Sequence, residues 1–176
     1  MVNGINLEGL QSYVDLIKKE PNEAVSSYRI QAEWQGGVKT KITAENQCVG
    51  STEIQKDFIF NIDEPVELLG SNSYPTPQDY LFGGLAGCMM VGFVVGASER
   101  NIILESVKLT IKGNLNLLGF LNIDPKASVG FEKIEFNFEV NGNGSQKDYD
   151  EIIAHVQQFS PNYRTISDAV VLSLSK

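Results

Sequence analysis

The chain has 176 residues, with 14 lysines and arginines against 22 aspartates and glutamates, which gives a net charge of −8. The acidic balance and the lack of a basic cluster exclude a surface that follows nucleic-acid phosphates and disfavour binding to anionic membranes. The length fits one globular domain, residues 1–176, with enough chain to bury a sizeable core.

The N-terminal residues 1–21 are predicted to form a helical extension. Asn6 is a candidate N-cap for a helix over residues 7–19, where apolar side chains recur every three or four positions, and Pro21 follows its end. We expect this helix to dock on the body of the protein or on a second subunit. The segment lacks the basic start and apolar run of a signal peptide, so we expect a cytoplasmic protein.

Three strands are predicted next. Residues 26–34 and 38–44 alternate apolar and polar side chains on either side of Gly36-Gly37, which is the pattern of a β-hairpin. Lys39 and Lys41 fall on the polar face of its second strand. A third strand is expected over residues 57–62, and a loop rich in turn-forming residues, 70–77, leads to the next element.

A long apolar segment follows, with no charged residue between Leu81 and Ala97. Pro77 suits the first turn of a helix, so we predict a helix over residues 77–100. Each of its five glycines weakens a helix by about 1 kcal/mol relative to alanine, so tight packing must offset them. The segment is also marginally short for a bilayer, which needs about twenty residues. Both features favour a buried central helix over a membrane span.

Cys88, in the middle of this helix, is the main candidate for chemistry. It shares a helical face with glycines, which leave room beside the sulfur for a backbone or a small ligand. Free cysteines are also commonly buried for packing alone, so both interpretations stay open. The other cysteine, Cys48, is forty residues away, a spacing that fits neither a zinc site nor a C-x-x-C redox pair. We therefore expect no metal.

The C-terminal half is predicted to contain more strands and one amphipathic helix. Ser145 is the expected N-cap of the helix, which ends at Ser160-Pro161. Helices and strands come in runs, which indicates an α+β fold. The predicted elements are strands over residues 105–113 and 130–140, with a bulge near Glu132-Lys133, an extended stretch over 115–120, the helix over 146–159 and a final strand over 169–174.

Several segments, in this order and spacing, resemble the OsmC/Ohr superfamily, the osmotically inducible and organic hydroperoxide resistance proteins. They are VNGINL at residues 2–7, PQDYLFGGLAGCM at 77–89, GNLNLLGFLNID at 113–124, VGFEKIEFNF at 129–138 and SPNYRT at 160–165. The second resembles the family's P-E-x-L-x-x-A-L-A-x-C helix. The resemblance covers nearly the whole chain. It implies curved antiparallel sheets around buried central helices, in an intertwined homodimer with sites at the subunit interface.

The resemblance also implies that Cys88 is the peroxidatic cysteine, whose thiolate attacks the O–O bond of a hydroperoxide. In the family an arginine from the early hairpin, held by a glutamate of the central helix, supports this thiolate. Here Gln78 follows Pro77 where the family has glutamate. Lys39 or Lys41 is the candidate cation, with Arg29 less favoured, and a lysine does not offer arginine's planar fork.

The family's second cysteine, in a C-P motif, regenerates the thiol through a disulfide, and Ser160 occupies that position here. Cys48 replaces it only if its Cα lies within about 7 Å of that of Cys88. Otherwise an external thiol reductant is required. His155, the only histidine, is predicted on the exposed side of its helix, which disfavours a Cys–His pair.

The sequence thus supports two main functional hypotheses. The first is a thiol-dependent peroxidase without a cofactor, which reduces small organic hydroperoxides at Cys88, with Gln78 and Ser160 lining the same pocket. The alternative is a non-catalytic protein of the same fold that binds a small hydrophobic or thiol-reactive ligand at the dimer interface. The losses of the glutamate and of the second cysteine favour it. A third hypothesis is a structural dimer in which Cys88 only packs.

Overall fold

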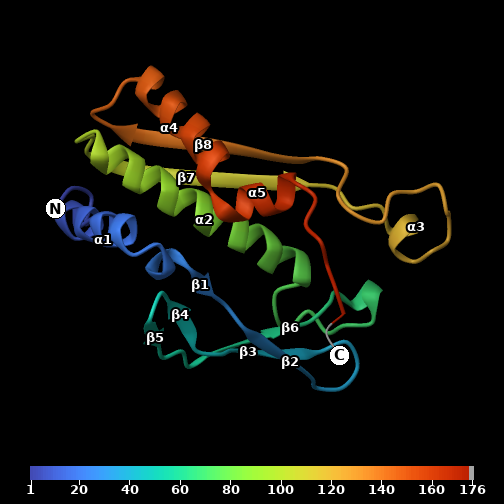
Figure 1. The fold of residues 1–176 in the computed structure, drawn as a ribbon. Coiled ribbons are helices and arrows are strands. Elements are labelled where there is room, and N and C mark those ends of the chain that lie inside the picture. Colours follow the sequence, from blue (N-terminus) through green and yellow to red (C-terminus); the bar gives the residue numbers. More distant parts are fainter. Residues whose placement is uncertain (175–176) are drawn as a thin grey trace. The chain divides into compact units, whose positions relative to one another are not determined.

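The computed structural model describes residues 1–174, which form two compact units (Figure 1). One unit spans residues 6–83, and the other joins residues 1–5 to the chain from Gly84 onward. Both units combine helices with antiparallel strands, which confirms the predicted α+β class. The long helix α2 (Pro77–Glu99) belongs to both units because the boundary falls inside it. One domain over residues 1–176 stays a prediction.

The unit of residues 6–83 begins with the predicted helix. The side chain of Asn6 accepts a hydrogen bond from the Gly9 N–H, so it is the N-cap of α1 (Leu7–Lys19) as the sequence indicated. A short 3₁₀ turn (Pro21–Ala24) follows. Two three-stranded antiparallel sheets complete the unit, in the orders β2-β3-β6 and β1-β4-β5. Their strands are β1 (Ser26–Ser27), β2 (Ile30–Trp34), β3 (Thr40–Ala44), β4 (Gln47–Val49), β5 (Thr52–Ile54) and β6 (Phe58–Ile62).

The β2-β3-β6 sheet confirms the predicted hairpin and the third strand. Residues that face one another across antiparallel strands point to the same side of the sheet. Ala32, Ile42 and Phe60 are such partners, so one face of the sheet is apolar. Parts of this face are open to solvent, since the side chains of Trp34 and Phe58 are 77% and 62% exposed.

A buried carboxylate organises the loop before α2. Asp63 Oδ2 accepts hydrogen bonds from the N–H groups of Ser71 and Ser73 and from the Ser71 hydroxyl, at 2.7 to 3.1 Å. These donors, the Ser73 N–H above all, hold the pKa of Asp63 well below its ordinary value although burial opposes them. Thr76 then begins α2, because its hydroxyl accepts from the Asp79 N–H while the Asp79 carboxylate accepts from the Thr76 N–H.

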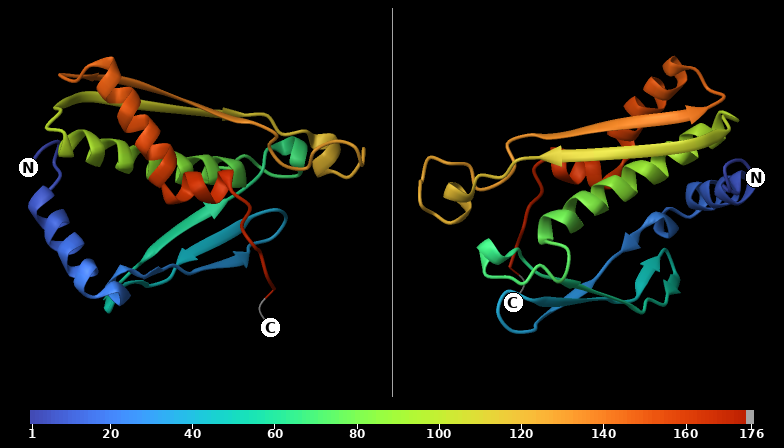
Figure 2. Two further views of the ribbon diagram at one scale, coloured as in Figure 1. Left: turned by 45° about the horizontal axis from the view of Figure 1, so that its top comes forward. Right: turned by 180° about the vertical axis from the view of Figure 1, so that it is seen from behind.

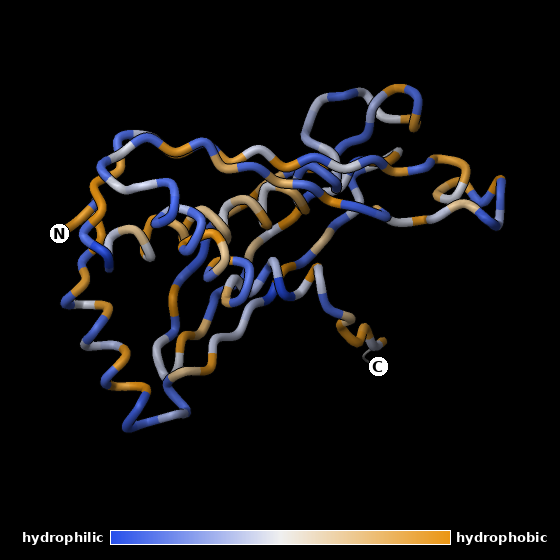
Figure 3. Tube along the Cα trace, turned by 90° about the horizontal axis from the view of Figure 1, so that it is seen from above, coloured by the Kyte–Doolittle hydropathy of each residue, from blue (hydrophilic) through white to orange (hydrophobic). Residues whose placement is uncertain are grey.

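The second unit packs α2 and another helix against a long β-hairpin, and α2 runs alongside the hairpin in both views of Figure 2. Strands β7 and β8 pair in antiparallel register, with an irregularity between Leu104 and Ser106. Apolar and polar residues alternate along them (Figure 3). The elements of this unit are β7 (Leu104–Gly113), α3 (Leu117–Phe120), β8 (Ile134–Gly142), α4 (Gln146–Phe159) and α5 (Pro161–Ser167).

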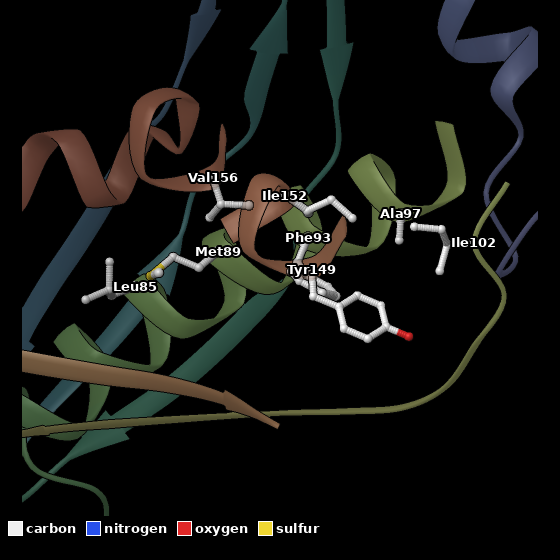
Figure 4. Packing of buried hydrophobic residues seen from close by; sticks show 8 residues of the cluster. All are labelled: Leu85, Met89, Phe93, Ala97, Ile102, Tyr149, Ile152 and Val156. Atoms are coloured by element: carbon white, nitrogen blue, oxygen red, sulfur yellow. The ribbon is translucent and has the colours of Figure 1, made fainter. Parts of the chain in front are cut away.

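One stripe of α2 forms the core of this unit (Figure 4). Met89 and Phe93 are fully buried, and the Phe93 ring stacks on Phe138 of β8 with centroids 4.8 Å apart. Helix α4 contributes Ile152 and Val156, which are 0% and 2% exposed. The stripe on α2 consists of Leu85, Met89, Phe93 and Ala97, at steps of four residues.

Burial all round the central helix, which the sequence predicted, is not observed. Val91 on α2 is 65% exposed, whereas Met89 and Phe93 on the same helix are fully buried. By length and apolar composition α2 could cross a membrane. Its buried stripe packs on the hairpin and on α4.

Two glycines of α2 explain how closely α4 approaches it. A Cβ atom built on Gly92 would lie 3.3 Å from Val156 Cγ2, and one built on Gly96 would lie 3.2 Å from Ile152 Cγ2. Such distances are tighter than ordinary van der Waals contact. The glycines that cost helix stability therefore allow α4 to pack against the helix backbone.

Three sequence predictions in this unit were wrong. Residues 117–120 form a short helix instead of an extended stretch, because the Asn116 side chain caps it by accepting from the Leu118 N–H. Strand β8 begins only at Ile134, so the expected bulge at residues 132–133 lies outside it. Residues 169–174 form no strand, and Leu172 and Leu174 are 94% and 93% exposed. None of the strands described over residues 1–174 pairs with this apolar segment.

Candidate functional site

Cys88 lies halfway along α2, and its sulfur receives a hydrogen bond from Ser160, at the junction of α4 and α5. The distance from Ser160 Oγ to Cys88 Sγ is 3.2 Å. Ser160 is 4% exposed, whereas Cys88 is half-buried. Two residues that are 72 positions apart in sequence thus meet inside one compact unit. The thiol keeps access to solvent, and the hydroxyl beside it is almost completely removed from water.

The helix junction fixes Ser160 in place. Its N–H donates to the carbonyl of Val156 at 2.8 Å, which closes the last turn of α4. Its hydroxyl oxygen accepts from the Tyr163 N–H at 3.4 Å, so Ser160 is also the N-cap of α5. Pro161 then occupies the first turn, where its missing N–H is not needed. A second tie, from Asn162 Nδ2 to the Gly84 carbonyl at 2.8 Å, joins α5 to α2 one turn before Cys88.

A cavity of about 230 Å³ begins within one helical turn of Cys88 along α2. Leu85, three residues before the cysteine, lines it together with Tyr163, whose N–H bonds to Ser160. Lys133, which also lines the cavity, already pairs with Glu135 at 2.9 Å. The apolar lining, which includes Leu85, Ile134, Phe136, Tyr163 and Ile166, suits the hydrocarbon part of a small molecule.

The cations expected from the sequence lie in the other unit, residues 6–83. Lys41 on β3 pairs with Glu33 across the hairpin at 3.4 Å, and Arg29 pairs with Glu45 at 3.1 Å. Lys39 is half-buried in the turn before β3 and lines a cavity with Asp63. The described contacts of these three side chains are thus with residues of their own unit.

Gln78 and Cys48 also belong to the unit of residues 6–83. Gln78 is the second residue of α2, about 15 Å along the helix axis from Cys88 at about 1.5 Å per residue. Cys48 is exposed on β4, in the centre of its small sheet, and both cysteines are free. Of the site residues expected from the sequence, Cys88 and Ser160 are the pair brought together within one unit.

The arginines in the unit of Cys88 are engaged elsewhere. Arg164 forms an ion pair with Asp168 at 2.7 Å, and Arg100 donates to the carbonyl of Gly96 at 3.0 Å. Among residues 1–174, the hydrogen bond to Cys88 Sγ comes from Ser160. His155 is exposed on α4, where its ring lies tilted against that of Phe159. No group of three or more histidine, cysteine or acidic side chains in the described part of the chain could hold a metal ion.

Sequence reasoning missed the buried Asp63, which directly follows the predicted third strand. The pKa of the neighbouring Glu64 is raised by burial and by the charges of Asp63 and Asp79. A signal was present in the Ser-Asn-Ser segment at residues 71–73, whose hydroxyl and N–H groups suit a carboxylate. Its bonds shape the loop before α2, and they touch neither Cys88 nor Ser160.

The OsmC-like protein family model matches residues 70–175, which include α2 and the Cys88–Ser160 pair. No curated protein sequence matches the chain. An OsmC-like protein from Mycoplasma pneumoniae has a similar structure, with a TM-score of 0.62, 18% identity and coverage of 80% of this chain and 87% of that one.

Two similar structures carry more specific descriptions. One is an organic hydroperoxide resistance protein, OsmC, from Legionella pneumophila, with a TM-score of 0.50, 20% identity and coverage of 80% and 88%. The other is an organic hydroperoxide resistance protein from Elizabethkingia anophelis with thiocyanate bound, with a TM-score of 0.51, 18% identity and coverage of 78% and 86%. At these identities the likenesses establish the fold.

Proposed function

Because the chain belongs to the OsmC-like protein family, we propose that it is a thiol-dependent peroxidase that reduces small organic hydroperoxides at Cys88. The observation that carries this proposal is the contact between the half-buried thiol and the buried hydroxyl of Ser160. A small substrate can reach such a thiol, and a fixed donor on the sulfur favours its reactive thiolate form. The role fits a protein of the oxidative stress response.

In the proposed reaction, the Cys88 thiolate attacks one oxygen of the hydroperoxide and breaks the O–O bond. The sulfur loses two electrons and becomes a sulfenic acid. The other oxygen leaves as an alkoxide, which takes a proton from water to give the alcohol. The apolar cavity beside Leu85 and Tyr163 accommodates the organic group of the substrate.

We propose that a thiol from outside the chain regenerates Cys88. Serine at position 160 cannot form a disulfide, and both cysteines are free in the structure. A low-molecular-weight thiol therefore condenses with the sulfenic acid, which releases water and leaves a mixed disulfide. A second thiol displaces Cys88 as a thiol and yields the oxidised reductant. The free cysteines and the thiol reductant both suit the cytoplasm.

We also propose a homodimer, as the family resemblance implied. The isolated chain exposes 12432 Å². Even two separate compact bodies of half its mass would expose roughly 10,000 Å². The uncovered surface includes large apolar side chains on the β2-β3-β6 sheet and on α2, among them Ile30, Trp34, Phe58 and Val91. A second copy that covers these side chains accounts for the excess.

The alternative function is the binding of a small hydrophobic ligand without turnover. The apolar cavity lined by Leu85, one helical turn from Cys88, favours it, as do the amide at Gln78 and the serine at the position of the second cysteine. In that case Cys88 either packs or forms a reversible adduct with a thiol-reactive ligand. For either function, a role for Lys39 or Lys41 as the cation near Cys88 stays a prediction.

Steady-state turnover distinguishes the two functions. We expect the protein to consume cumene hydroperoxide when dithiothreitol is supplied, Cys88→Ser to lose this activity completely, and the matched control Cys48→Ser to keep it. Full turnover by a folded Cys88→Ser variant would contradict the peroxidase proposal. Absence of turnover in the wild-type protein, together with saturable binding of an apolar probe, would support the binding alternative.

A further inference from the structure

The side chain of Ser160 takes part in two hydrogen bonds, as acceptor from Tyr163 and as donor to Cys88. A serine hydroxyl offers one hydrogen and accepts through its oxygen. The oxygen already accepts from the Tyr163 N–H, so the hydrogen is available for Cys88 Sγ, 3.2 Å away. Since Ser160 is only 4% exposed, water does not compete effectively for that hydrogen.

We propose that Ser160 is a catalytic residue, whose hydroxyl stabilises the thiolate of Cys88 by donating a hydrogen bond to its sulfur. This inference rests on the proposed peroxidase function and assigns the serine a role beyond the loss of a second cysteine. Hydrogen bonds to an ionised acceptor are roughly twice as strong as those between neutral groups. The contact therefore favours the thiolate over the thiol.

Other sources of thiolate stabilisation are weak inside this unit. Cys88 lies eleven residues beyond Pro77, about three turns from the N-terminus of α2, and the helix dipole acts mainly within the first turn. Arg100 and Arg164, in the same unit, are bound to other groups. The hydroxyl of Ser160 is the donor that the described structure places on the sulfur.

The donor is also held rigidly, which matters because a donor that must first reorient contributes less to a reaction. Its backbone N–H closes α4, its side-chain oxygen caps α5, and Asn162 ties the first turn of α5 to the backbone of α2. Ser160 keeps its own proton throughout the reaction, and the alkoxide is protonated by water. Because Ser160 occupies the position of the family's second cysteine, no disulfide forms there and the sulfenic acid persists until an external thiol reduces it.

The test compares Ser160→Ala with Ser145→Ala. Both substitutions remove a serine N-cap, but Ser145 starts α4 and does not touch Cys88. We expect Ser160→Ala to slow the formation of the Cys88 sulfenic acid by about tenfold at pH 7, as expected for loss of a hydrogen bond to a charged group. The midpoint of the pH profile for iodoacetamide alkylation should rise by about one pH unit. Ser145→Ala should change neither value.

Two further variants keep the inference falsifiable. Ser160→Thr retains the hydroxyl and should restore both the rate and the pH profile. Ser160→Cys puts a thiol beside Cys88. Cumene hydroperoxide should oxidise Cys88 to the sulfenic acid, which condenses with this thiol to form an intramolecular disulfide and releases water. The protein should then be lighter by two hydrogens. This variant tests the contact directly if Ser160→Ala does not fold.

The outcomes separate this inference from the proposed function. A wild-type protein whose Cys88 resists hydroperoxide would contradict the peroxidase proposal, while the alkylation profiles would still measure the effect of Ser160. An unchanged rate and an unchanged pH profile in folded Ser160→Ala would overturn the role of the serine. The role of the serine would also be overturned if hydroperoxide oxidised Cys88 in the Ser160→Cys variant but no disulfide formed between residues 88 and 160.

Discussion

Two serine-capped helix starts in the same unit show how surroundings change the work of one residue type. Ser145 and Asp148 form an exposed capping box, in which the hydroxyl donates to the carboxylate at 2.6 Å. Ser160 also caps a helix, but the third residue after it is Tyr163, which offers no carboxylate. Its hydroxyl hydrogen is directed to Cys88 instead. The same capping signal is thus purely structural at α4 and adjacent to a candidate nucleophile at α5.

The largest expected effect is a loss of folding stability when the core packing of α4, the helix that ends at Ser160, is weakened. Ile152→Ala removes a fully buried side chain that packs against Gly96 and should lower the free energy of unfolding by about 2–5 kcal/mol. Chemical denaturation measures the loss. Val171→Ala is the matched control, since Val171 is 90% exposed and should change little. Equal stability losses in the two variants would contradict the packing described for α4.

A smaller effect is expected at the α4 cap. Ser145→Ala removes the bond to the Asp148 N–H and the donor to its carboxylate, and should cost about 1 kcal/mol of stability. The rate of Cys88 oxidation should stay at the wild-type value. A variant that is destabilised and also has a slower thiol would mean that capping alone controls the site, and the contrast between the two serines would fail.

The smallest expected effect is a change in how the stability of the protein depends on pH. The Ser145 hydroxyl, followed by its N–H, lowers the pKa of Asp148 from its ordinary value. The ionised carboxylate therefore contributes stability that is complete above the ordinary aspartate pKa and is lost as the pH falls through the lowered one. Asp148→Asn should flatten the acid limb of the stability curve in thermal unfolding. An unchanged acid limb would show that this carboxylate does not couple to folding.

Local signals in the sequence predicted much of the fold. Asn6 and Ser145 marked the starts of α1 and α4 because a side-chain cap depends on residues only three positions away. The turn at Gly36-Gly37 and the alternation around it likewise located the β2–β3 hairpin. Helix α5 was missed because Pro161 was read only as the end of α4. Proline after a serine also suits the first turn of a new helix.

Features that depend on distant partners could not be read from periodicity. Residues 169–174 are mostly apolar, as in many buried strands, but a strand also needs a neighbour with free N–H and C=O groups. The one-sided burial of α2 depends on which elements pack against it, and its composition is apolar on every side. The family resemblance indicated Cys88 and Ser160 as site residues. The contact between them and the direction of the hydrogen bond came from the structure.

The most direct test of the central claim is intact-protein mass spectrometry with peptide mapping. The folded protein is exposed briefly to one equivalent of cumene hydroperoxide in the presence of dimedone, which traps sulfenic acids. We predict rapid labelling of Cys88 and none of Cys48, although Cys48 is the more exposed of the two cysteines. Labelling confined to Cys48, or a folded protein whose Cys88 stays unmodified, would contradict the proposal that Cys88 is the reactive thiol.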